Sequence, residues 1–172
     1  MSDGPEGRVP PHNLDAEASV LGGVLLRNGA LALVLERGVE SEDFYHPAHR
    51  AIFGAMLELD SRSQPIDPIT VADQLKQDDR ARGIADPEAL LADLAARVPT
   101  AENIGHYARL VHEKSSLRRM IAAAGEVTGK AFSDMGEIAQ FLDWAEGRIF
   151  QVAQRTERQS YVSIKKLLQQ KV

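Results

Sequence analysis

Apolar residues recur at helical spacing along most of the chain, and they do so most regularly in its last third. From residue 137 onward they are separated by alternating steps of four and three residues. This heptad pattern predicts a helix over about residues 137–154 that packs along its length against a partner helix. The stripe, which Phe141 and Phe150 widen, consists of Ile138, Leu142, Ala145, Ile149 and Val152.

A second long apolar stripe covers about residues 101–131, and a break at residues 132–136 separates the two. The two helices would form an antiparallel hairpin over residues 100–154, and the first would be about 45 Å long at about 1.5 Å per residue. Such a hairpin has more apolar surface than two helices can cover, so we expect it to project and to pair with another copy or another protein. The predicted interface residues are Ile138, Phe141, Leu142, Ala145, Ile149 and Val152.

Five shorter helices are predicted before the hairpin, in a globular head over residues 13–99. Asn13 is placed to cap the first helix, and a proline in the first turn begins three others. Gly22 and Gly23 fall inside the first helix, where we expect another backbone to approach closely. The fold is therefore predicted to be all-α, a multi-helix head plus a long antiparallel helical hairpin, with head helices over about 14–27, 30–37, 47–59, 68–77 and 87–98.

The two ends of the chain have a different character. Residues 1–12 are polar and proline-rich, and we predict a disordered tail rather than a signal peptide. Residues 155–172 are predicted to be a polar linker followed by the start of a linker helix. That short helix needs a surface to dock on, and its predicted docking residues are Ile164, Leu167 and Leu168.

Composition narrows the class of protein. The 172 residues include no cysteine, which excludes disulfides and thiolate metal sites and favours an intracellular protein. No apolar run approaches the roughly 20 residues that cross a membrane. Residues 1–100 carry a net charge of −8 and residues 101–172 a net charge of +3, so a general DNA-binding surface on the front half is disfavoured.

Candidate chemistry is sparse, and each candidate has a simpler structural explanation. The sequence contains no G-x-x-x-x-G-K-[ST], G-x-G-x-x-G or H-E-x-x-H run. Three weak candidates are a metal site at His46 and His49, a nucleophile at Ser115-Ser116 with His112 as base, and an acid/base pair of Asp67 and Asp86. We favour packed or capping roles for all of them, so no catalytic, cofactor-binding or metal-binding residue is predicted.

Two exposed features of the hairpin are candidates for partner binding. Lys114, Arg118 and Arg119 form a basic cluster that could contact phosphate, DNA or an acidic partner, although a solvated helix face is the favoured interpretation. At the hairpin tip, apolar side chains flank a turn that should point into water, which suggests a contact site. The predicted partner-binding residues are Val127, Phe132 and Met135, and the alternative is that Phe132 folds back on Val127 or Ile138.

Several runs, taken together, resemble the N-terminal domain of bacterial replicative DNA helicases of the DnaB family. Residues 11–23 (PHNLDAEASVLGG) resemble its opening helix, and residues 43–53 (DFYHPAHRAIF) its "DFY.P.HR.I(F/Y)" run. Residues 65–71 (PIDPITV) and 98–103 (VPTAEN, followed by Tyr107-Ala108) match two further runs. The resemblance extends over about residues 10–155, and one departure is the loop over residues 83–91.

The resemblance implies a non-catalytic domain for assembly and docking. In the family the hairpins pair between subunits, and six copies form a trimer-of-dimers hexamer, a collar that binds primase and, in some lineages, a helicase loader. ATP and Mg²⁺ belong to a motor domain that this chain lacks, and DNA is met only through the full-length ring. We therefore expect a cytoplasmic, nucleoid-associated replisome component with no membrane contact. The alternative is a stand-alone helical adaptor or regulator of the replisome.

Overall fold

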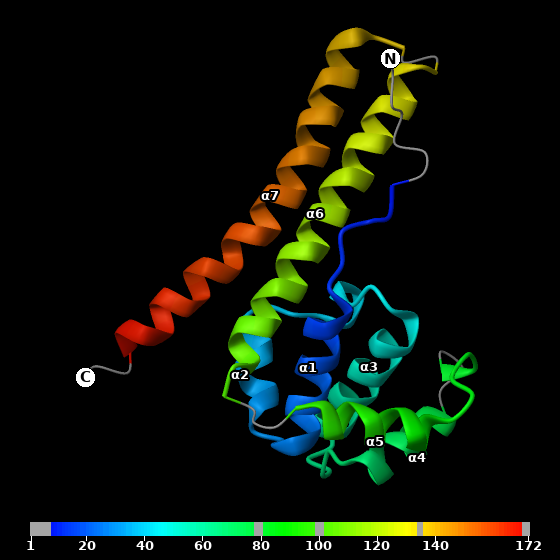
Figure 1. Ribbon diagram of the computed structural model, residues 1–172. Coiled ribbons are helices and arrows are strands. Elements are labelled where there is room, and N and C mark those ends of the chain that lie inside the picture. Colours follow the sequence, from blue (N-terminus) through cyan, green and yellow to red (C-terminus); the bar gives the residue numbers. More distant parts are fainter. Residues whose placement is uncertain (1–7, 78–80, 99–101, 134–135, 170–172) are drawn as a thin grey trace.

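The chain folds into a head of short helices from which two long helices rise side by side (Figure 1). A computed structural model describes residues 8–77, 81–98, 102–133 and 136–169, with side chains described as far as Gln154. Every regular element in these ranges is helical, which confirms the all-α prediction. The elements are α1 (Leu14–Leu26), α2 (Ala30–Glu36), the 3-10 turn η1 (Ser41–Asp43), α3 (Pro47–Ser61), α4 (Pro68–Lys76), α5 (Pro87–Arg97), α6 (Ile104–Ala131) and α7 (Ile138–Gln169).

Local sequence signals set most helix boundaries in the head. The Asn13 side chain accepts a hydrogen bond from Ala16 N at 2.9 Å and caps α1. Asp67 caps α4 in a capping box with Thr70, and Asp86 caps α5. Gly38 follows α2 with a φ of 72°, a left-handed conformation that glycine adopts without steric cost.

The core of the head is built around α1, which lies against α2, α3, α5 and the first turns of α6. Gly22 and Gly23 make the α1 contacts possible. A Cβ on Gly22 would overlap the Leu94 carbonyl oxygen of α5, and a Cβ on Gly23 would lie 2.8 Å from Cδ1 of Ile104 in α6. The predicted close approach is therefore confirmed, and it is what lets α5 and α6 pack directly on α1.

The hairpin begins and ends at residues other than those predicted. Helix α6 starts at Ile104 rather than Ala101, and its N-cap Asn103 makes no side-chain cap bond; Thr100, the expected cap, lies outside the described residues. Helix α7 continues without a break to Gln169, so the predicted polar linker after Gln154 is wrong. The physical reason is that residues 155–160 are polar but contain neither Gly nor Pro, and polarity alone does not end a helix.

The N-terminal prediction also needs a correction. Residues 1–7 lie outside the described part, but Pro11 and His12 are held in place rather than disordered. The Arg118 guanidinium of α6 donates to Pro11 O at 2.8 Å, and the His12 ring stacks on Tyr45 with centroids 4.3 Å apart.

Within the described part of the chain, no helix is long and apolar enough to cross a membrane.

Candidate assembly and docking surface of the hairpin

The side of α7 that faces α6 is defined by contacts between the two helices. Arg148 of α7 pairs with Glu126 of α6, and the Lys130 ammonium lies 4.0 Å from the centroid of the Trp144 ring. The apolar side chains on this side of α7 are only partly exposed, namely Phe141, Ala145 and Val152. Among the described residues, the hairpin is therefore closed by partly buried apolar side chains together with an ion pair and a cation–π contact.

A second apolar stripe lies beside this seam and is open to solvent. Leu142 is 58% exposed, and Ile138 and Ile149 share its side of α7. On α6, Leu117 and Ile121 are exposed in the same way, with Ile121 at 55%. The two helices contribute to one face, because Leu117 lines an apolar groove together with Ala153, which is one turn beyond Ile149. We call these five residues, Leu117, Ile121, Ile138, Leu142 and Ile149, the outer stripe.

The structure thus divides the six predicted interface residues into two groups. Phe141, Ala145 and Val152 are partly buried and share the side of α7 that carries Arg148, whereas Ile138, Leu142 and Ile149 are exposed. The heptad pattern identified the apolar positions of α7 but could not assign them to two different neighbours. Sequence reasoning also missed that Leu117 and Ile121 join the exposed face, although both belong to the predicted stripe of the first long helix.

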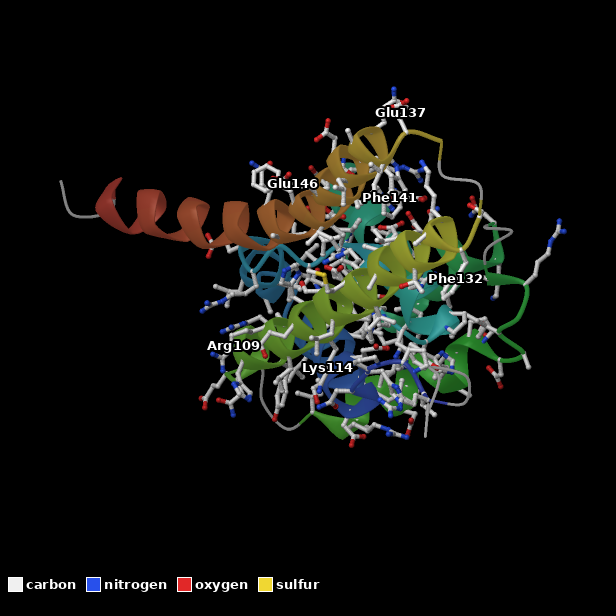
Figure 2. All side chains as sticks on the ribbon, turned by 90° about the horizontal axis from the view of Figure 1, so that it is seen from above. Arg109, Lys114, Phe132, Glu137, Phe141 and Glu146 are labelled. Atoms are coloured by element: carbon white, nitrogen blue, oxygen red, sulfur yellow. The ribbon has the colours of Figure 1, made fainter. Side chains whose placement is uncertain are left out.

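The hairpin tip carries a nearly fully exposed aromatic ring. Phe132 is 90% exposed at the end of α6, so the alternative in which it packs back on Val127 or Ile138 is wrong. In Figure 2 Phe132 lies at the far end of α6 from Arg109 and Lys114. Phe141 and Glu146 lie on α7, and Glu137 lies just before it. Val127 is partly buried, and Met135 lies outside the described residues.

Two residues of the basic cluster, Arg118 and Arg119, are bonded to the head and do not belong to a solvated helix face. Arg119 pairs with the buried Asp43 carboxylate at 2.8 Å, and Arg118 donates to the Asp43 and Pro11 carbonyl oxygens. The favoured interpretation of a solvated face is therefore wrong for Arg118 and Arg119, because α6 leaves the head at this height. Lys114 is partly exposed.

Asp43 collects hydrogen bonds from both the head and the hairpin. Its carboxylate accepts from Ser115 Oγ at 2.7 Å, from Glu40 N at 3.0 Å and from Arg119, and it lies 3.3 Å from His112 Nδ1. Burial alone would raise the pKa of Asp43, but these hydrogen bonds and the Arg119 charge hold that pKa below its ordinary value. The carboxylate therefore stays ionised inside the protein.

Glu17 is the second buried carboxylate, and it lies on the core side of α1. It accepts hydrogen bonds from Tyr45 N at 2.7 Å and His46 N at 3.2 Å, and His49 Nδ1 lies 2.8 Å away. Burial opposes ionisation, yet the hydrogen bonds from His49, Tyr45 and His46 lower the pKa of Glu17. The sequence analysis did not identify Glu17 or Asp43 as buried acids. For Glu17, the position of an acid inside the apolar stretch of α1 was the available signal.

The residues considered as catalytic or metal-binding candidates make hydrogen bonds that serve the fold. His46 caps α3 by accepting from Ala48 N, and His49 is bonded to Glu17. Ser116 Oγ lies 3.4 Å from His112 Nε2, but Ser116 is in the middle of α6, where backbone N–H groups are used by the helix and cannot stabilise an oxyanion. Asp67 and Asp86 each accept from the N–H groups of their own helix. Within the described ranges, no three His, Asp or Glu side chains are grouped to hold a metal ion.

The head and the first turns of α6 match a known family. The family model described as DnaB-like helicase N terminal domain matches residues 9–113. The chain belongs to this family. The resemblance seen in the sequence is confirmed.

Relatives named as replicative DNA helicases match almost the whole chain. It is 42% identical over 165 residues to the replicative DNA helicase DnaB of Mycobacterium leprae, covering 95% of this chain and 27% of that protein. It is 38% identical over 170 residues to the replicative DNA helicase DnaC of Bacillus subtilis, covering 99% of this chain and 37% of that protein. The chain thus spans only about a third of the length of these helicases and corresponds to their N-terminal domain.

Solved structures agree with this assignment. The crystal structure of the N-terminal domain of DnaB helicase from Mycobacterium tuberculosis matches with a TM-score of 0.77 and 40% identity, over 83% of this chain and 99% of that one. A DnaB-like replicative helicase, described with its interactions with primase, matches with a TM-score of 0.64 and 22% identity over 81% of this chain and 31% of that one. The second match shows the shared fold alone.

Proposed function

We propose that this domain assembles a hexameric replicative DNA helicase and recruits its partners during DNA replication. The observation that carries the proposal is the outer stripe, which presents apolar side chains of both hairpin helices on one solvent-facing side. Contact between these apolar side chains and water is unfavourable, and a second hairpin offers a matching surface by two-fold symmetry. The stripes of two copies would then close a four-helix bundle.

The larger assembly follows the same reasoning. Three such dimers would form a trimer-of-dimers collar on a ring of motor domains in the longer protein, where ATP and Mg²⁺ would bind. The family membership and the relatives named as replicative helicases support this reading. DNA would meet the ring rather than this domain, and the assembly would work in the bacterial cytoplasm at the replisome.

Partner recruitment is assigned to the hairpin tip and the C-terminal part of α7. Phe132 is the most exposed large apolar side chain described at the tip, and we propose that it contacts primase, with Val127 and Met135 beside it. A helicase loader is a second partner for the same collar. Ile164, Leu167 and Leu168, in the last turns of α7, are proposed to dock on a neighbouring motor domain.

Self-association is tested by sedimentation of the chain over a series of concentrations, with light scattering for mass. The wild-type mass should rise with concentration to a dimer or hexamer. Leu142→Lys, in the outer stripe, should remain a monomer, because pairing would bury an ammonium group. Ile69→Lys is the matched control, since Ile69 is also an exposed apolar residue but lies on α4 of the head. A Leu142→Lys protein with the wild-type mass profile would contradict the pairing face.

A further inference from the structure

The contact between α6 and the head changes character along the helix. Over its first turns the contact is apolar, because Ile104, Ala108 and Val111 are buried in the core of the head. Over the next turns the contact is polar: Ser115 and Arg119 bond to the Asp43 side chain, and Arg118 bonds to backbone oxygens. Arg119 is the last residue of α6 whose bonds to the head are described, so the polar contacts lie where the hairpin leaves the head (Figure 1).

Asp43 is at the centre of these polar contacts, and it is bonded in both directions. On the head side, its carboxylate accepts from Glu40 N and closes the capping box of η1. On the hairpin side, Ser115, Arg119 and His112 surround the same two oxygens. Its side chain is 1% exposed, so water cannot replace a lost partner easily.

Arg118 forms a second polar contact beside the first. Its two terminal nitrogens donate to Asp43 O and to Pro11 O, and its guanidinium lies 5.6 Å from the centroid of the Tyr45 ring. The N-terminal segment and the turn after η1 are thereby held against the same height of α6. The root of the hairpin is thus bonded to two separate segments of the head.

We propose that Asp43 is a positioning residue that fixes the direction of the hairpin relative to the head. Apolar contacts such as those of Ala108 and Val111 are non-directional and would permit a pivot about α6, whereas hydrogen bonds to a buried carboxylate hold one angle. About 18 Å of α6 extends beyond Arg119, so a rotation of about 10° at the root displaces the tip by about 3 Å. This inference concerns a single protomer and goes beyond the proposed pairing of hairpins.

The direction is measured by the distance between two spin labels. The chain has no cysteine, so Gly129→Cys on α6 and Ala92→Cys on α5 accept one nitroxide each. Both positions are exposed, and a side chain at Gly129 meets nothing within 4 Å. Labelled protein is diluted into unlabelled protein, so that double electron–electron resonance reports only distances within one protomer, whether or not the hairpins pair.

We expect one narrow distance distribution in the otherwise wild-type protein and a clearly broadened or shifted one in Asp43→Asn. Asp93→Asn, which removes an exposed acid paired with Arg97 within α5, should leave the distribution narrow. Thermal unfolding by circular dichroism is measured alongside. An Asp43→Asn protein that is less stable but keeps the wild-type distance distribution would overturn the proposal, because the residue would then stabilise without positioning.

A second pair of variants decides the matter if Asp43→Asn does not fold. Arg119→Met removes the ion pair from the hairpin side, and Arg119→Lys keeps a cation that can reach the carboxylate. The proposal requires a broadened distribution in Arg119→Met and a return toward the narrow one in Arg119→Lys. Equally narrow distributions in both variants would overturn it.

Discussion

The side-chain amide of Asn28 pairs in both directions with the backbone of Ile66, 38 residues further along the chain. Its Oδ1 accepts from Ile66 N at 2.9 Å, and its Nδ2 donates to Ile66 O at 2.5 Å. Asn28 follows α1, and Ile66 is a buried residue just before α4. The amide therefore satisfies both backbone polar groups of a buried residue, as a neighbouring strand would.

Because both groups of the Asn28 amide are bonded, replacing its NH2 group alone should destabilise the protein. Asn28→Asp keeps an acceptor for Ile66 N but replaces the donor to Ile66 O with a carboxylate oxygen. The carbonyl and the carboxylate would then repel each other, and we expect a loss of about 1–3 kcal/mol in the free energy of unfolding. Urea denaturation near neutral pH measures it. Asp60→Asn, on the exposed end of α3, should change the stability by less than about 0.5 kcal/mol.

Gly22→Ala should destabilise the head although alanine favours helices. The added Cβ would collide with the Leu94 carbonyl and lie 2.7 Å from Val98 Cγ2, so α1 and α5 would have to separate. Such overpacking costs about 1–3 kcal/mol, more than the gain of about 1 kcal/mol from helix propensity. Gly125→Ala on α6 is the matched control. A Cβ there meets nothing within 4 Å, so we expect a gain of up to about 1 kcal/mol. A thermal melt in which both variants are stabilised would contradict the close packing.

Acid should unfold the head by protonating its two buried carboxylates. The pKa values of Glu17 and Asp43 are lowered in the folded state, so each contributes stability above its ordinary pKa of 4.5 or 3.8. That contribution is lost as the pH falls below these values through the lowered folded-state pKa. Urea denaturation at several values between about pH 6 and pH 3 should therefore show nearly constant stability above about pH 5 and falling stability below it.

The matched variant for this pH dependence is Glu17→Gln. It should be less stable than the wild type near neutral pH, because glutamine accepts fewer and weaker hydrogen bonds from Tyr45 N, His46 N and His49. Its stability should fall less steeply with acid, since one of the two titrating groups is gone. An unchanged slope would assign the acid sensitivity to other groups.

Phe132→Ala separates partner binding from folding. Because the ring is 90% exposed, its removal should change the free energy of unfolding by less than about 0.5 kcal/mol and leave the mass in solution unchanged. Binding to purified primase, measured by calorimetry, should weaken at least several-fold under the proposed function. Phe150→Ala, an exposed phenylalanine on α7 away from the tip, is the control. Wild-type affinity in Phe132→Ala would leave the tip without a role in docking.

Local signals in the sequence were sufficient to predict most of the head. Asn13, Asp67 and Asp86 cap helices where predicted, because a capping bond reaches only two or three residues along the chain. The spacing of apolar residues after residue 100 predicted two long helices packed as a hairpin, and the structure confirms them as α6 and α7.

The polar contacts between segments that are distant along the chain could not be predicted from the sequence. Asp43 and Ser115 are 72 residues apart, and nothing at either position indicates that they meet. The same reason explains the wrong interpretation of Arg118 and Arg119, which resemble any exposed basic pair until the position of η1 is known. The division of the α7 stripe between α6 and solvent likewise depends on the rotation of the helix, which a heptad pattern does not fix.

Helix α7 is continuous from Ile138 to Gln169, so the second half of the hairpin is rigid along its length. Its 32 residues extend over about 48 Å at about 1.5 Å per residue, and its last turns lie away from α6 (Figure 1). A flexible linker would bend under a force applied near Gln169, whereas a continuous helix transmits that force to its opposite end. A load applied near Gln169 would therefore change the angle of the whole helix and reach the start of α7 at Ile138.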